Sequence, residues 1–101
     1  MQKDVTISWS KFDHGKGEVT TAAAKIAHTD FVCERGVLIK AATGNSGTVY
    51  IGNSDVTNAD IGNTSGFELG SGESMFLEVN NVNKVYAIAT ADKQSVFWVA
   101  V

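Results

Sequence analysis

The sequence of 101 residues has no proline, a single cysteine and no long apolar run. Because Cys33 has no second thiol for an internal disulfide or a metal cluster, we expect it to be a buried small hydrophobe. No apolar run approaches the roughly 20 residues that cross a bilayer, and the start, MQKDVTISWSKF, lacks the regions of a secretory signal. The sequence predicts production in a cytoplasm and no membrane partner.

Charge is also scarce, since charged residues make up 19% of the chain and the net charge is −3. Phosphate binding depends on localised positive charge, and no cluster of Lys or Arg is present, so we expect no nucleic-acid partner. A hydrophobic content of 44% predicts a folded chain rather than a disordered one. The length allows one β domain over residues 1–101, with 1–17 as an N-terminal arm or a first strand plus loop.

Apolar and polar residues alternate along most of the chain, which is the period of β-strands. Val5, Ile7 and Trp9 form the first alternating run, and the stretch SKFDHGKG, residues 10–17, is expected to end it because two glycines interrupt the pattern. Residues 18–29 are ambiguous between a short Ala-rich helix and a strand, and their paired threonines favour an extended segment.

Further short runs with strand character follow, separated by turn residues. The runs 37–42 and 48–51 flank TGNSG and are expected to form a hairpin. Seven or eight short strands at this spacing predict an all-β protein, a small antiparallel β-sandwich or jelly-roll-like domain. The remaining expected strands cover residues 67–69, 75–79, 85–90 and 95–101.

A Gly-Asn-(Ser/Thr) step occurs three times, at Gly44, Gly52 and Gly62. A phosphate-binding loop would lead into a helix, whereas each of these steps leads into a strand or more loop. A solenoid would keep a fixed period, which the spacing of these glycines does not. The steps are therefore interpreted as β-turns, in which Gly and Asn tolerate positive φ and Asn bonds to its local backbone.

Motifs of catalysis are missing, because the chain has neither Gly-x-Ser-x-Gly nor His-Glu-x-x-His and its two histidines are His14 and His28. We expect no enzyme, no catalytic residue, no cofactor and no resident metal. Two stretches of the chain carry side chains that could bind a metal. Asp13 and His14 lack a third ligand at a suitable spacing, and an oxygen-rich stretch that suggests calcium lacks the central Gly and closing Glu of the twelve-residue loop, which favours Asx turns. That stretch contains Asn53, Asp55, Asn58 and Asp60.

The run from Cys33 to Val101 contains GVLIKAATGNSGTVYIGNSDVT, then GFELGSGESMFLEV, then KVYAIATADKQSVFWVAV. This order resembles small virion structural proteins of tailed bacteriophages and prophages. The shared pattern is a small residue before the first core strand, an N-x-G-x-V-Y-[IV]-G-x-S-x-V-T hairpin, a glycine-glutamate strand start, a [LV]-Y-x-I strand and a closing tryptophan strand.

The resemblance implies a phage particle component located in the virion, most plausibly a capsid decoration or head-fibre subunit that stabilises the head. Its partners would be the major capsid protein or another virion protein. The alternative is a fibre-tip or carbohydrate-recognising β-domain for host attachment, which would bind glycans through exposed aromatic rings.

The C-terminal segment SVFWVAV has no charge and strong β propensity, which makes it an aggregation hazard on a free edge. We expect it to lie between two neighbouring strands, with Phe97 and Trp98 on opposite faces, one in the core and one at a contact. Strands apolar on both faces also predict cover by a second copy or a large partner, and hence a homo-oligomer. The candidate interface residues are Trp98, Phe97, Tyr86, Val99 and Val101.

Overall fold

The structure, a computed structural model, describes residues 11–58 and 63–101. The alternating run Val5, Ile7 and Trp9 lies outside the described residues, as do Asp60 and Gly62. Within the described ranges every regular element is a β-strand except for one short 3₁₀ turn, η1, at Val82–Lys84. The ambiguous segment 18–29 is extended and contributes a short strand, so the prediction of an extended segment there is confirmed.

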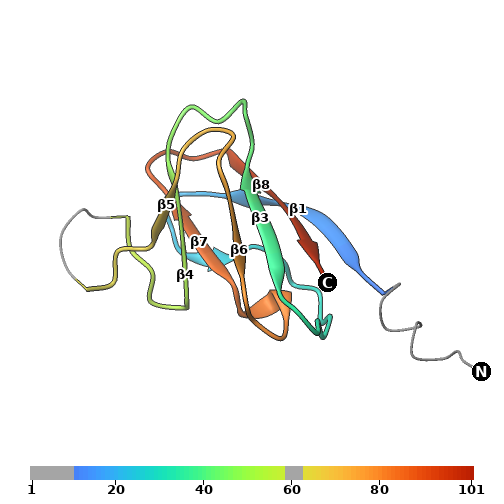
Figure 1. Ribbon diagram of the computed structural model, residues 1–101. Coiled ribbons are helices and arrows are strands. Elements are labelled where there is room, and N and C mark those ends of the chain that lie inside the picture. The colour runs from blue at the N-terminus through green and yellow to red at the C-terminus, as the bar shows by residue number, and fades with distance from the viewer. Residues whose placement is uncertain (1–10, 59–62) are drawn as a thin grey trace, which may run out of the picture.

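Eight strands form two four-stranded antiparallel sheets that pack as two layers (Figure 1). The first sheet has the order β1-β8-β3-β6 and the second the order β2-β7-β4-β5. The prediction of a small all-β sandwich of seven or eight short strands is confirmed. The strands are β1 (Asp13–Val19), β2 (Ala24–Lys25), β3 (Val37–Ala41), β4 (Val49–Gly52), β5 (Phe67–Leu69), β6 (Ser74–Leu77), β7 (Tyr86–Ala89) and β8 (Gln94–Ala100).

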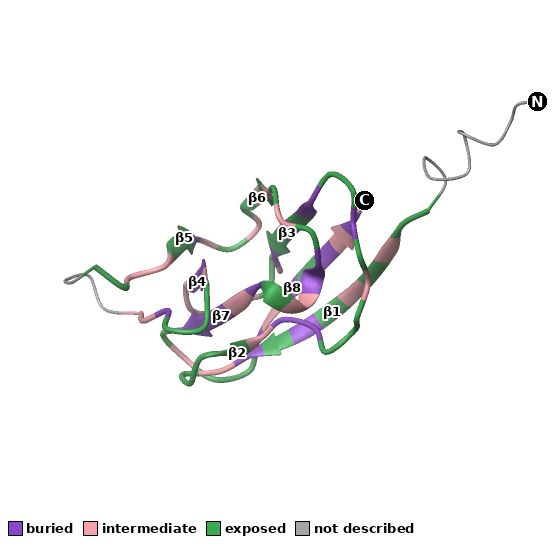
Figure 2. Cartoon of the chain, turned by 90° about the horizontal axis from the view of Figure 1, so that it is seen from below, coloured by how far each residue is buried: buried purple, intermediate pink, exposed green. Residues whose placement is uncertain are grey.

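Alternation along the strands places the core between the sheets, and buried and exposed positions alternate along β1 and β8 (Figure 2). On β3, Val37, Ile39 and Ala41 are fully buried while the residues between them are exposed. The core combines β-branched and small residues from both layers with one large aromatic, Trp98. Since β8 pairs with β1 on one side and β3 on the other, the predicted central position of the C-terminal strand is confirmed.

The expectation that residues 10–17 interrupt the strand pattern is wrong from Asp13 onward, because β1 runs from Asp13 to Val19. Gly15 and Gly17 lie on its inward face, opposite Trp98 and Val96 of β8. A Cβ at position 15 would lie 2.6 Å from the Trp98 ring, and one at position 17 would collide with the main-chain carbonyl of Ile26. These glycines therefore permit close packing inside a strand rather than a turn.

The expected hairpin between residues 37–42 and 48–51 is also wrong, although both strands exist. β3 belongs to the first sheet and β4 to the second, so the connection crosses between the layers. Asn45 explains how this loop is held: its side-chain amide donates to Ser95 O at 3.0 Å, and its Oδ1 accepts from Ser95 N at 2.9 Å. The side chain of Asn45 thus occupies the place of a strand partner beside β8.

The Gly-Asn steps are turns or strand ends, but their detailed chemistry differs from the expectation. Gly44 lies in the crossing loop and Gly52 ends β4, and neither has a positive φ. Asn53 accepts a local bond from Asp55 N at 3.3 Å, as expected of an Asx turn, whereas Asn45 bonds to distant Ser95. The Gly-Asn pair therefore serves two different purposes at its two described sites.

The outer face of the second sheet is covered by the chain itself. Tyr50 of β4 and Ile88 of β7 are directly opposed, and Val56 from the loop after β4 packs on them with Tyr86 alongside. Tyr50, Val56 and Ile88 are all buried. For β7, the expectation that a partner must cover its second face is therefore wrong, because a loop outside the strand pattern supplies the cover.

Candidate interaction surface

The outer face of the first sheet carries the main apolar surface of the described residues. Val99 of β8, Leu38 of β3 and Phe76 of β6 lie directly opposite one another across three neighbouring strands, and Phe97 lies two residues before Val99, on the same face of β8. Leu38 is 45% exposed, and Phe76 and Phe97 are each 47% exposed. These four residues are called the apolar patch below. Local alternation forces them outward, because their neighbours along each strand fill the core.

Cations flank the apolar patch on the Phe97 side. Phe97 lies between Lys16 of β1 and Lys40 of β3, its directly opposite neighbours. The ammonium group of Lys16 is 6.0 Å from the centre of the Phe97 ring, at the limit of a cation–π contact. On the far side of the patch, Glu78 follows β6. The surface is thus apolar at its centre and basic beside Phe97, while Glu34 and Glu78 lie together with Arg35 at the Phe76 end.

The size of the apolar patch is typical of a surface that binds another molecule. A phenylalanine side chain has about 150 to 250 Å² to bury, so the two half-exposed rings, with Leu38 and part of Val99, leave on the order of 300 Å² of apolar surface. Contiguous patches of this size on small soluble proteins are often binding surfaces. The face is an open sheet surface with a hollow beside Phe76 rather than an enclosed cavity, which suits a macromolecule better than a small ligand.

The structure does not bring the five candidate interface residues together. Phe97 and Val99 lie in the apolar patch, and Val101 follows β8 on the same face, held by main-chain bonds to Gly36. Trp98 is 4% exposed and belongs to the core, so Phe97 is the outward residue of the pair. Tyr86 lies on the outer face of the other sheet, half-buried against the chain's own loop.

Leu38 and Phe76 were not among the candidate interface residues. A usable signal was present in VLIKA, residues 37–41, because alternation places Leu38 on the same face as the charged Lys40. Phe76 shares no such marker, since SMFL is apolar at three successive positions. Its exposure depends on the pairing of β6 with β3, which local pattern does not specify.

Two side chains of the oxygen-rich stretch, Asn53 and Asn58, bond to main-chain groups. Asn58 Nδ2 donates to Ala89 O at 2.8 Å, which ties the loop after β4 to β7. Within residues 11–58 and 63–101, no group of three His, Cys, Asp or Glu side chains is placed to hold a metal ion. Nor does that part of the chain contain a helix long and apolar enough to cross a membrane.

Cys33 is buried, as expected, and its Sγ donates to Val79 O at 3.1 Å. Burial raises the pKa of the Cys33 thiol, and a hydrogen bond from the backbone offsets part of this effect. A buried thiol with a raised pKa is a poor nucleophile. Cys33 therefore acts as a packing residue beneath the segment that follows β6.

Comparison of the chain with protein-family models, curated proteins and solved structures finds no match.

Proposed function

We propose that the chain is a structural protein of a tailed-phage virion, a head decoration subunit that binds the assembled shell and stabilises it. Two observations support this proposal. The order of turn and strand motifs from Cys33 to Val101 resembles small phage virion proteins. The apolar patch on the first sheet is a broad, flat surface of the kind that a protein shell can cover. The apolar patch is the observation that carries the proposal.

The rival function, recognition of cell-surface glycans, is less well supported by the same surface. In the described ranges the exposed aromatic side chains are Phe12, Phe67, Phe76 and Phe97. Phenylalanine offers a ring face but no polar handle, whereas Tyr50 and Trp98, which would offer both, are buried, and Tyr86 is half-buried against the chain's own loop. Cover by an apolar protein surface needs no such handle, so the shell is the better partner.

The proposal is tested by adding purified protein to heads of the encoding phage that lack this subunit. We expect saturable co-sedimentation with the heads and greater resistance of the decorated heads to heat or osmotic shock. The major capsid protein is the expected partner. Binding to tails, bare cells or glycans, with none to heads, would instead establish the attachment function.

A matched pair of variants locates the contact. Phe97→Ser removes the outward-facing ring that lies between Lys16 and Lys40. We expect the affinity for heads to fall at least about tenfold. Val32→Ser is the control, because Val32 is also exposed but lies outside the strands of the two sheets, in an isolated bridge with Asn81. Both variants should keep the β circular dichroism spectrum. Equal head binding by both variants would show that the apolar patch does not contact the shell.

A further inference from the structure

Strand β6 is an unpaired edge of the first sheet in the described part of the chain. It follows β3 at the end of the order β1-β8-β3-β6, and no described strand lies beyond it. Natural edge strands are protected by shortness, charged residues, Pro or a bulge, and β6, which is four residues long, has no Lys or Pro within Ser74–Leu77. Two glutamates, Glu73 and Glu78, flank the strand at its two ends.

The main-chain groups that β6 leaves free can be assigned from its pairing with β3. Ala41 N donates to Glu73 O at 2.9 Å, so the backbone of Glu73 faces β3. Because this direction alternates along an antiparallel strand, Met75 and Leu77 also face β3. The N–H and C=O groups of Ser74, Phe76 and Glu78 therefore point away from the sheet.

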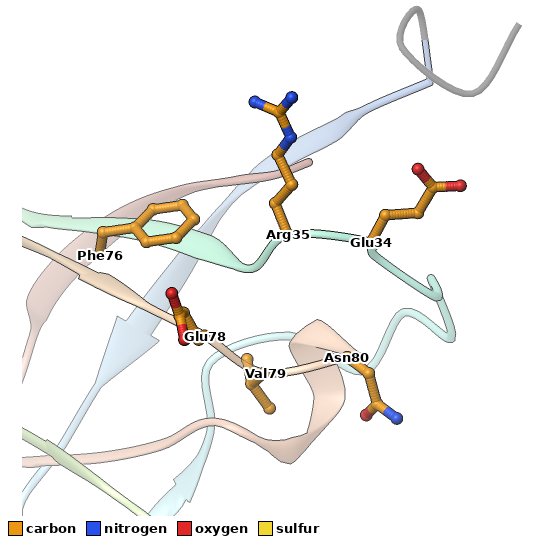
Figure 3. A pocket seen from close by; sticks show the side chains of 6 residues that line it. All are labelled: Glu34, Arg35, Phe76, Glu78, Val79 and Asn80. Carbon is orange, nitrogen blue, oxygen red and sulfur yellow. The ribbon is translucent and has the colours of Figure 1, made fainter. Parts of the chain in front are cut away.

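Hollows lie on both sides of this edge. Figure 3 shows the outer one, where Phe76 and Glu78 stand beside Glu34 and Arg35 from the turn before β3. The inner hollow lies between the free edges of the two sheets. Its walls include Phe67 of β5, which is 59% exposed, together with Met75, Leu77, Val79 and Lys84. Partly exposed apolar side chains therefore lie on both sides of the unpaired backbone of β6.

We propose that β6 pairs antiparallel with β6 of a second copy of this chain, across a twofold axis that passes beside Phe76. The two first sheets would join into one continuous sheet of eight strands, with each Phe76 next to its counterpart. This pairing goes beyond the proposed decoration function and does not depend on it.

The free backbone groups select this register. A twofold axis at Phe76 sets Ser74 of one copy opposite Glu78 of the other, so all three outward-facing residues on each strand form hydrogen-bonded pairs. An axis at Glu78 would place two glutamates face to face, which is unfavourable. An axis at Ser74 would leave Glu78 of each copy without an opposite residue in β6. The edge is therefore self-complementary in the register centred on Phe76.

Charge supports a second copy as the occupant. In this register Glu73 of the second copy lies opposite Val79, on the side of the inner hollow. Lys84 lines that hollow beside Glu78 and Val79, and both Lys84 and Glu73 are exposed. In this pairing Lys84 of each copy would lie on the same side as Glu73 of the other, whose Oε1 also accepts from its own Gly70 N at 2.7 Å, twice by symmetry. The pairing also extends the row of Val99, Leu38 and Phe76 into the same row of the second copy.

The oligomeric state of the full chain provides the first test. We expect sedimentation equilibrium between about 1 µM and about 1 mM to show a monomer–dimer equilibrium, because an edge contact buries less area than a permanent interface. A chain that stays monomeric over this whole range would overturn the proposal.

Introducing a positive or a negative charge at position 76 tests the register. Phe76→Lys and Phe76→Glu each place two like charges at the axis, so each variant alone should dimerise at least about tenfold more weakly than the unchanged chain. An equimolar mixture of the two variants should recover association, because Lys then faces Glu. Circular dichroism of each variant checks that the fold is kept, and the mixture remains informative if both lose some stability.

Phe97→Ser serves as the control, because it alters the apolar patch without touching the β6 edge, and it should dimerise normally. Three results would contradict the pairing: undiminished dimers of Phe76→Lys, no recovery in the mixture of folded variants, or equal loss in Phe97→Ser. The competing occupant is the N-terminal segment 1–10. Association lost on deletion of 1–10 but unaffected by the Phe76 variants would overturn the proposal in favour of that segment.

Discussion

The neighbouring aromatics Phe97 and Trp98 should respond very differently to truncation. Trp98 is 4% exposed and packs against Gly15 and Ile39, whereas Phe97 is 47% exposed on the outer face. Replacing a buried aromatic by Ala costs about 3 to 5 kcal/mol, because a cavity adds to the lost transfer energy. Burying a whole phenylalanine stabilises a fold by about 1.5 to 3 kcal/mol, so a half-exposed ring contributes about 1 kcal/mol.

These values are large against the total stability of a domain of this size, about 5 to 15 kcal/mol. Trp98→Ala should lower the melting temperature by at least about 12 °C, or leave the chain unfolded, since 1 kcal/mol corresponds to about 4 to 8 °C. Phe97→Ala should lower it by about 8 °C at most. Thermal and urea unfolding, followed by far-UV circular dichroism, measure both. Equal losses in the two variants would refute the assignment of Trp98 to the core and Phe97 to the surface.

Three further predictions test the packing, the crossing loop and the buried thiol. Gly17→Ala should destabilise the fold by about 1 to 3 kcal/mol, because the added Cβ meets the carbonyl of Ile26, whereas Gly44→Ala, with open space around it, should be nearly neutral in urea unfolding. Asn45→Asp keeps the acceptor for Ser95 N but loses the donor to Ser95 O, so it should cost about 1 to 3 kcal/mol, and an unchanged unfolding midpoint would count against the role of this side chain. Burial raises the pKa of the Cys33 thiol, so the native chain keeps its proton where the unfolded chain loses it. The free energy of unfolding should therefore fall as the pH rises past the ordinary thiol value of 9.0, and should fall less in Cys33→Ala, as urea titrations at several pH values would show.

Period-2 alternation was enough to predict six of the eight strands, because the six expected runs from 37–42 to 95–101 coincide with β3 to β8 to within a few residues at their ends. The same alternation put Phe97 and Trp98 on opposite faces. Burial of Cys33 was predicted from a different observation, that a lone thiol without a partner packs as a small hydrophobe. These features are local, since each depends on the side chains of one segment and on the geometry of a strand.

The pairing of the strands could not be predicted from alternation. TGNSG has the composition of a hairpin turn, yet Asn45 bonds to Ser95, fifty residues away, and the chain crosses to the other sheet. Gly15 and Gly17 look like a break until Trp98 and Ile26 lie against them. In both cases the partner that decides the structure is distant in sequence.

The sequence by itself determined the class of fold, because alternation of apolar and polar residues is a property of each strand alone. Only the tertiary structure decided which apolar faces are covered by other parts of the chain. Val56 covers Tyr50 and Ile88 from a loop that no strand pattern marks, while Phe76 and Phe97 stay exposed because no described segment packs over the outer face of the first sheet. Burial is a property of what lies opposite a side chain, and strand order and loop paths set that over long sequence separations.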